Sequence, residues 1–352
     1  MIKMELDSFP EFISFTLTNA CNLRCQMCGQ WSEKGYIKNR VIDNKGILKS
    51  EDWKRLVDEI ANYNIRFVLV RGGEPFLFKG IIDLLKYING KGIFLSVDTN
   101  GTLIDQYADD LAKITQMHIT FSVDGDEATH DNVRKVKGSF EKIKNNIKLL
   151  NELENKHNNK ISKSICFTIS KYNYTVLNKM PEVARSMGIG SINAVPYYYF
   201  SGETGELYKK ELEENFNIKA FSWKGFSHRE SGVDFDRFES VYSDYLKELN
   251  GIENFPYMPL TMDDYKIWFN DSSTPVGSLV CRNIENLIDI QPNGDVNFCV
   301  DFPDYKFGNV KTATIKELWH SPEAEAFRKY RRNKPLAVCH RCGAKYISEI
   351  KE

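Results

Sequence analysis

The chain has 352 residues, enough to bury a large core, and its 47 basic and 48 acidic residues leave a formal net charge of −1. This balance excludes the strong positive field that draws proteins to nucleic acids and anionic membranes, so neither is expected as a partner. The sequence shows no signal peptide and no membrane-spanning segment, so a cytoplasmic location is expected.

Up to residue 200, short apolar runs alternate with helical patterns. The predicted strands are 12–18, 65–71, 92–98, 117–123, 161–169 and 190–196. The predicted helices are 50–62, 79–88, 104–114, 139–154 and 174–187, with Ser50 and Ser139 as the N-caps of the first and fourth. Six strands separated by helices indicate a parallel α/β architecture with right-handed crossovers.

Several of these strands carry one polar face. In the strand 117–123, Ile119 and Phe121 alternate with Thr120 and Ser122, and the strands 12–18 and 161–169 repeat the pattern. Parallel strands of an open sheet are usually apolar on both faces. An apolar face against helices and a hydroxyl-rich face toward a lumen therefore predict a partly open α/β barrel, whose active site lies at the carboxyl ends of the strands.

Three of the eight cysteines, Cys21, Cys25 and Cys28, fall within eight residues directly after the first strand. In a reducing compartment such a set is more typical of metal binding or catalysis than of disulfides. Iron–sulfur clusters normally take four thiolates, so three clustered thiols suggest one iron that is left open. A zinc knuckle is the alternative, although it favours paired C-x2-C ligands and a fourth Cys or His nearby.

The spacing C-x3-C-x2-C resembles the signature of the radical S-adenosylmethionine (SAM) superfamily. This resemblance implies a partial (β/α)6 barrel over residues 1–200 and a [4Fe–4S] cluster on the three cysteines. It further implies SAM bound to the open iron and cleaved reductively to a 5′-deoxyadenosyl radical. The electron would come from a low-potential donor such as flavodoxin or ferredoxin.

Further motifs follow the strands in the order of that family. Gly72-Gly73-Glu74-Pro75 looks like the motif that receives the SAM amino group, and Asp98-Thr99-Asn100-Gly101 is similar to the ribose-contacting loop. Ser122-Val123-Asp124-Gly125, His130-Asp131, Arg134 and Gly138-Ser139-Phe140 resemble the branch with C-terminal auxiliary clusters. The resemblance thus implies that SAM is contacted by Gly72, Gly73, Glu74, Pro75, Asn100, Ser122, Asp124 and Arg134. Taken singly, each of these residues is equally compatible with a turn, a cap or a surface position.

Two features between the barrel and the C-terminal cysteines allow more than one interpretation. Cys166 is either a small buried apolar residue or, because it is expected to face the lumen, a catalytic hydrogen-atom donor to a substrate radical. Residues 201–276 are rich in aromatic side chains, with one helix predicted at 234–249. They form either a connector whose rings fill a small core or a lid over the barrel mouth.

Residues 277–352 carry the second cysteine set. Strands 285–291 and 295–300 flank Pro292-Asn293-Gly294-Asp295, a strong hairpin signal, and helices are predicted at 313–319 and from Pro322. The set comprises Cys281, Cys299, Cys339 and Cys342. It resembles the SPASM or shorter twitch domain, a small α+β unit, and its four cysteines suffice for one fully ligated auxiliary [4Fe–4S] cluster. A zinc ribbon is the alternative.

A fully ligated second cluster suits electron transfer, so we expect a net oxidation of the substrate. The Ser/Thr-rich lumen, and the lack of a further domain before the first strand, favour a small polar, sugar- or cyclitol-like substrate. The runner-up is a maturase of ribosomally made peptides or another protein-modifying enzyme. A non-catalytic iron–sulfur or zinc scaffold is a more distant alternative.

Overall fold

The computed structural model describes residues 9–39, 46–256, 258–277 and 280–345. Most of the chain start, in which we expect no signal peptide, therefore lies outside the described residues. Among the residues that are described, no helix is both long and apolar enough to cross a membrane.

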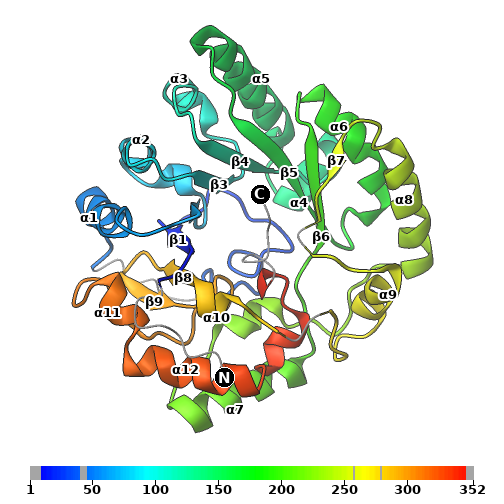
Figure 1. The fold of residues 1–352 in the computed structure, drawn as a ribbon. Coiled ribbons are helices and arrows are strands. Elements are labelled where there is room, and N and C mark those ends of the chain that lie inside the picture. Colours follow the sequence, from blue (N-terminus) through cyan, green and yellow to red (C-terminus); the bar gives the residue numbers. More distant parts are fainter. Residues whose placement is uncertain (1–8, 40–45, 257, 278–279, 346–352) are drawn as a thin grey trace.

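One ten-stranded sheet organises the molecule, in the order β10-β9-β8-β1-β2-β3-β4-β5-β6-β7 (Figure 1). The strands are β1 (Phe12–Thr16), β2 (Phe67–Arg71), β3 (Leu95–Thr99), β4 (Met117–Ser122), β5 (Ser162–Ile169), β6 (Ser191–Pro196), β7 (Glu253–Asn254), β8 (Leu287–Ile290), β9 (Asp295–Asn297) and β10 (Gly308–Asn309). From β8 through β7 all neighbouring strands are parallel, whereas β8, β9 and β10 form an antiparallel meander. The predicted barrel of six parallel strands is confirmed.

Figure 1 shows the helices of the barrel outside the curved sheet, except α4, which lies toward its inner side. They are α1 (Ser50–Ile60), α2 (Ile81–Gly90), α3 (Ala108–Leu111), α4 (Glu127–Arg134), α5 (Ser139–His157) and α6 (Met180–Ser186). The predicted helices 104–114 and 174–187 each begin as a 3₁₀ turn, at Ile104–Gln106 and at Tyr174–Lys179, before they become α-helical.

The alternation along the strands separates core from lumen as predicted. In β4, Ile119 and Phe121 are fully buried toward the helices, while Thr120 and Ser122 on the other face stay half-buried. The same rule holds in β5, where Phe167 is buried and Cys166 half-buried. The half-buried face therefore lines a polar interior.

Both predicted serine N-caps are wrong by one position. Lys49 is the N-cap of α1, and the Asp52 carboxylate accepts its backbone N–H at 2.8 Å. Gly138, in a left-handed conformation, precedes α5. There the Asp131 carboxylate accepts the Ser139 hydroxyl at 2.8 Å and the Phe140 N–H at 2.9 Å. A carboxylate from an earlier helix thus replaces the local serine cap.

Among the described residues of the region 201–276, the structure has three α-helices rather than the one helix predicted. They are α7 (Gly202–Phe216), α8 (Phe235–Glu248) and α9 (Met262–Asn270). Many of its rings are buried, among them Tyr208, Phe238, Tyr245, Tyr265 and Trp268. Core filling therefore accounts for much of the aromatic content.

The C-terminal hairpin also differs from the prediction. The predicted strand 285–291 is divided into the short α10 (Asn283–Asn286) and β8, and β8 pairs with β1 of the barrel, Phe12 opposite Leu287. The auxiliary region is thus continuous with the barrel sheet. The helices α11 (Ile315–Trp319) and α12 (Pro322–Asn333) follow, and Cys339 lies in the 3₁₀ turn Ala337–Arg341.

Candidate active site and cluster-binding residues

The loop after β1 holds the first three cysteines beside hydrogen-bond donors. The Leu23 N–H donates to Cys21 Sγ at 3.5 Å, and the Trp31 N–H donates to Cys28 Sγ at 3.3 Å. Arg134 Nη1 donates to Cys25 Sγ at 3.4 Å. Donors directed at sulfur favour the thiolate form, which is the form that binds iron. The residues present therefore fit a cluster held by this loop.

Burial, by contrast, favours the protonated form of the free Cys21 thiol. It raises the pKa of Cys21 to about 12, and the nearby Cys25 and Glu74 add to the rise, while the Leu23 N–H lowers it. Because ligands must be deprotonated to bind a metal, the positive charge of a cluster has to displace this proton.

Arg134 is fixed between the cysteine loop and a buried carboxylate. Its Nη2 lies 2.5 Å from Asp124 Oδ2, and the Asp124 side chain has no exposed surface. The second oxygen of Asp124 accepts the Thr168 N–H at 3.0 Å. Asp124 and Arg134, both predicted SAM contacts, are thus brought together. The geometry assigns Asp124 the positioning of the guanidinium beside Cys25.

The Gly72-Gly73 pair packs against the start of the cysteine loop. A Cβ on Gly73 would lie 2.2 Å from the Ala20 carbonyl oxygen, so no larger residue fits. The Gly73 N–H donates to Thr18 at 2.7 Å and the Glu74 N–H donates to Ala20 at 2.8 Å. The glycines therefore fix the loop that carries the cysteines. Pro75, which is buried, starts a 3₁₀ turn after them.

Glu74 is almost fully buried and joins two of the predicted motifs. Its carboxylate accepts the Thr99 hydroxyl at 2.8 Å, the Asn100 N–H at 2.8 Å and the Phe76 N–H at 3.1 Å. Burial raises its pKa to about 7, although these donors lower it. The Asn100 side chain donates in turn to Asn22 of the cysteine loop at 2.8 Å. The predicted SAM motifs thus converge on the loop.

Ser122 and Cys166 lie next to each other in the register of β4 and β5, both half-buried. Burial raises the pKa of Cys166 to about 12, with Asp98 as the next cause. The thiol therefore stays protonated at neutral pH, as either interpretation of Cys166 requires.

A largely half-buried group of charges in the lumen was not recognised as a group from the sequence, although Asp98 belongs to one of the predicted motifs. Arg71, the last residue of β2, lies 3.6 Å from Asp301. The negative charges of Asp98 and Asp289 also act on the Arg71 guanidinium. Burial raises the pKa of the Asp98, Asp289 and Asp301 carboxyl groups. The available signals were Arg71, a charged residue at the carboxyl end of β2 directly before Gly72, and Asp98, the first residue of the second motif.

The four C-terminal cysteines converge. Cys281, Cys299, Cys339 and Cys342 line one cavity together with Tyr208, Phe302, Arg331 and Lys345, among others. Burial raises the pKa of Cys281 to about 11, and that of Cys299 and Cys342 well above the usual range. Four thiols around one enclosed space are the ligand set of a fully ligated cluster.

The connector lies against both cysteine sites. Gly29, next to Cys28, packs on Phe226 so closely that a Cβ would lie 2.3 Å from its ring. The ring centroid of Phe226 is 5.0 Å from that of Phe302, which lines the cavity of the second site. Aromatic packing thus joins the two sites.

An open α/β barrel with a three-thiol loop at its mouth and a four-thiol cavity beside it defines an iron–sulfur enzyme. Residues 15–174 match the profile of the Radical SAM superfamily, and residues 281–343 match that of SPASM, an iron–sulfur cluster-binding domain. The chain is therefore a radical SAM enzyme with a C-terminal SPASM domain, and the predicted pair of clusters and SAM are its cofactors. The zinc alternatives are thereby excluded.

Known proteins similar to this chain differ in what they make. It is 25% identical to the Fe-coproporphyrin III synthase of Methanosarcina barkeri, over 97% of this chain and 81% of that protein. It is 29% identical to the sporulation killing factor maturation protein SkfB of Bacillus subtilis, over 53% of this chain but only 43% of that protein. The crystal structure of Streptococcus suis SuiB bound to the precursor peptide SuiA has the same fold, with a TM-score of 0.65 and 18% identity, covering 98% of this chain and 74% of that one.

Proposed function

We propose that this enzyme oxidatively modifies a peptide, with the auxiliary cluster as the electron acceptor. The observation that carries the oxidative part is the half-buried Arg71–Asp301 pair. It joins the barrel wall, one residue before Gly72, to the segment that follows Cys299. This ion pair therefore links the lumen, which would hold the substrate, to the segment that carries the auxiliary-cluster ligand Cys299.

The peptide class rests on the similarity to SkfB, which is named as a maturation protein. This relative supports the peptide alternative better than the sugar- or cyclitol-like substrate that the polar lumen first suggested. A tetrapyrrole is the second candidate, because the similarity to the Fe-coproporphyrin III synthase runs along 97% of this chain.

The bound cluster and SAM supply an electron and a radical that removes a hydrogen atom from the substrate. The protein's own residues prepare the site for this. Glu74 fixes the loops around Asn100, and Asp124 holds Arg134 at Cys25. A low-potential donor such as flavodoxin or ferredoxin, in the cytoplasm, is proposed to reduce the first cluster.

Oxidation also requires that the substrate lose a proton. Asp98 is suited to accept it, because burial raises the pKa of this carboxyl, whereas the nearby Arg71 and Thr120 lower it. A raised pKa makes a carboxylate a stronger base, which suits a general base. In contrast to Asp301, which pairs with Arg71, the Asp98 side chain has a hydroxyl as its hydrogen-bond partner.

Deuterium transfer tests the substrate class. The reconstituted enzyme, with reductant and SAM, is incubated with deuterated candidate precursor peptides, with a deuterated porphyrin-type precursor of Fe-coproporphyrin III or with a deuterated aminocyclitol. Mass spectrometry of 5′-deoxyadenosine then reports which substrate lost a hydrogen atom. Label from a peptide is the expected result, and the Cys25→Ala variant is the control that should give none.

Label from the porphyrin alone would overturn the peptide proposal in favour of the second candidate. Label from the cyclitol alone would restore the small polar substrate. With the correct substrate, Asp98→Asn should still form labelled 5′-deoxyadenosine but slow product formation about 100-fold, within the usual range for loss of a general base.

A further inference from the structure

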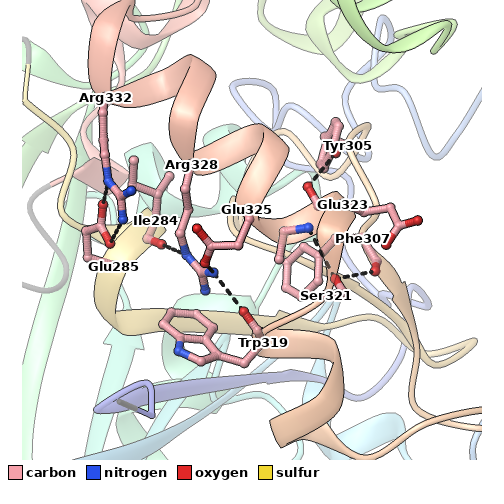
Figure 2. Close-up of polar contacts among 11 residues, drawn as sticks. Ile284, Glu285, Tyr305, Phe307, Trp319, Ser321, Glu323, Glu325, Arg328 and Arg332 are labelled. Atoms are coloured by element: carbon pink, nitrogen blue, oxygen red, sulfur yellow. Dashed lines mark hydrogen bonds and ion pairs between the residues drawn. The ribbon is translucent and has the colours of Figure 1, made fainter. Parts of the chain in front are cut away.

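Helix α12 carries three arginines whose side chains contact different groups. Figure 2 shows two of them: Arg328 reaches inward to Trp319 and Ile284, and Arg332 pairs with Glu285 on the surface. Arg328 Nε donates to the Ile284 carbonyl at 2.8 Å and its Nη1 donates to the Trp319 carbonyl at 2.7 Å. Arg332 Nε lies 2.6 Å from Glu285 Oε1. Both have evident structural partners.

Arg331 is different, because it lines the cavity of the four cysteines. Only 7% of this residue is exposed. Its Nη1 donates to the Lys334 carbonyl at 2.8 Å. Among the described residues, no carboxylate forms an ion pair with Arg331. A buried cation normally needs a negative partner. Here the thiolates of the second site are the anions available.

The electrostatics of the site agree with this geometry. Burial alone lowers the pKa of Arg331, but the four surrounding cysteines, Cys339 first, raise it above its ordinary value. The other charged groups at the cavity are Lys345, whose Nζ donates to the Val276 carbonyl at 3.1 Å, and Asp301, which is paired with Arg71. Arg331 is thus a cation whose charge faces the cluster ligands.

We propose that Arg331 sets the reduction potential of the auxiliary cluster. A reduced cluster carries one more negative charge than the oxidised one, so a nearby fixed cation stabilises the reduced form. Arg331 therefore raises the potential and makes the cluster a better acceptor for the electron that the substrate gives up. The role rests on the auxiliary cluster alone and holds whichever substrate class is correct.

The test is an anaerobic redox titration of the reconstituted full-length enzyme, followed by electron paramagnetic resonance. The signal that changes on addition of SAM belongs to the first cluster, and the other signal reports the auxiliary cluster. Arg331→Gln removes the charge but keeps a donor for the Lys334 carbonyl. Its auxiliary midpoint should fall by about 59 mV, a tenfold change in the one-electron equilibrium constant, while the first cluster keeps its midpoint.

Two variants control for structural effects. Arg331→Lys keeps the charge and should stay near the wild-type midpoint, and Arg332→Gln, one residue along the same helix, should change nothing. An unchanged auxiliary midpoint in Arg331→Gln would overturn the proposal. So would loss of auxiliary iron in Arg331→Gln with full iron in Arg331→Lys, because Arg331 would then build the site rather than tune it.

Discussion

The two cysteine sites of this molecule are built in opposite ways. Cys21, Cys25 and Cys28 lie within eight residues of one loop, and the nearby Leu23 and Trp31 supply N–H donors to the sulfurs. The four cysteines of the second site come from three separate segments and meet only when β8, β9 and the C-terminal turn are in place. The first site is thus shaped largely by local sequence, and the second depends on long-range packing.

The largest expected effect follows from removing one ligand at each site. Cys25→Ala should abolish SAM cleavage, because a loop with two thiols no longer holds the open cluster. Cys299→Ala should leave part of the SAM cleavage but stop substrate turnover. Chromatography of 5′-deoxyadenosine and of product from the reconstituted variants separates the two outcomes.

Iron analysis controls this comparison. The wild type should bind about eight iron atoms per chain and each variant about four. Full turnover by a Cys299→Ala enzyme that has lost its auxiliary iron would show that the second cluster accepts no electron.

The dependence of the second site on packing can be tested at Arg341, which lies between Cys339 and Cys342. This buried guanidinium donates to the backbone carbonyl of Tyr199, just before the region 201–276, at 3.0 Å, and to those of Asp271 and Thr274 within it, at 2.7 Å and 3.1 Å. Arg341→Met leaves these acceptors unpaired. It should lower the free energy of unfolding by about 3 kcal/mol, measured by urea denaturation.

Auxiliary iron should be lost before iron of the first site in this variant, because Arg341 holds the turn that carries two ligands. Arg332→Met is the matched control, since Arg332 makes a partly exposed surface pair whose loss should cost less than about 1 kcal/mol. Equal loss of iron from both sites in Arg341→Met would mean that the two sites are stabilised together.

The same contrast explains what could be predicted from the sequence. The barrel followed from local periodicity, because each strand shows its buried and lumen faces in alternating residues such as Phe121 and Ser122. The helices α7 and α9 were missed because their tertiary contacts outweigh weak local signals. The pairing of β8 with β1 was not predictable, since it joins residues about 275 positions apart.

The candidate site shows a similar division. The cysteines and the glycine motif were recognised from their resemblance to the family pattern. The sequence did not show that Asp124 is committed to Arg134, because that pair depends on how α4 folds back onto the end of β4. The lumen charges Arg71 and Asp301 were likewise hidden, because 230 residues separate them in the chain.

The smallest effect concerns acid sensitivity and is specific to the first site. His130 is fully buried next to this site, and its Nδ1 accepts the Asp124 N–H at 3.1 Å. Burial, and then Arg134, lower its pKa from 6.5 to about 3. Between these values the unfolded chain binds more protons than the folded one, so the stabilising contribution is full above pH 6.5 and is lost progressively as the pH falls.

Proton linkage at His130 then predicts that the free energy of unfolding of the wild type falls by about 1 kcal/mol between pH 6.5 and 5.5. The buried carboxyl groups with raised pKa act in the opposite direction, so the informative quantity is the difference between wild type and His130→Gln in urea denaturation at the two pH values. Arg332→Gln, whose side chain does not titrate between these pH values, is the control and should leave the difference at zero. A difference of zero between the wild type and His130→Gln would contradict the assignment of this effect to His130.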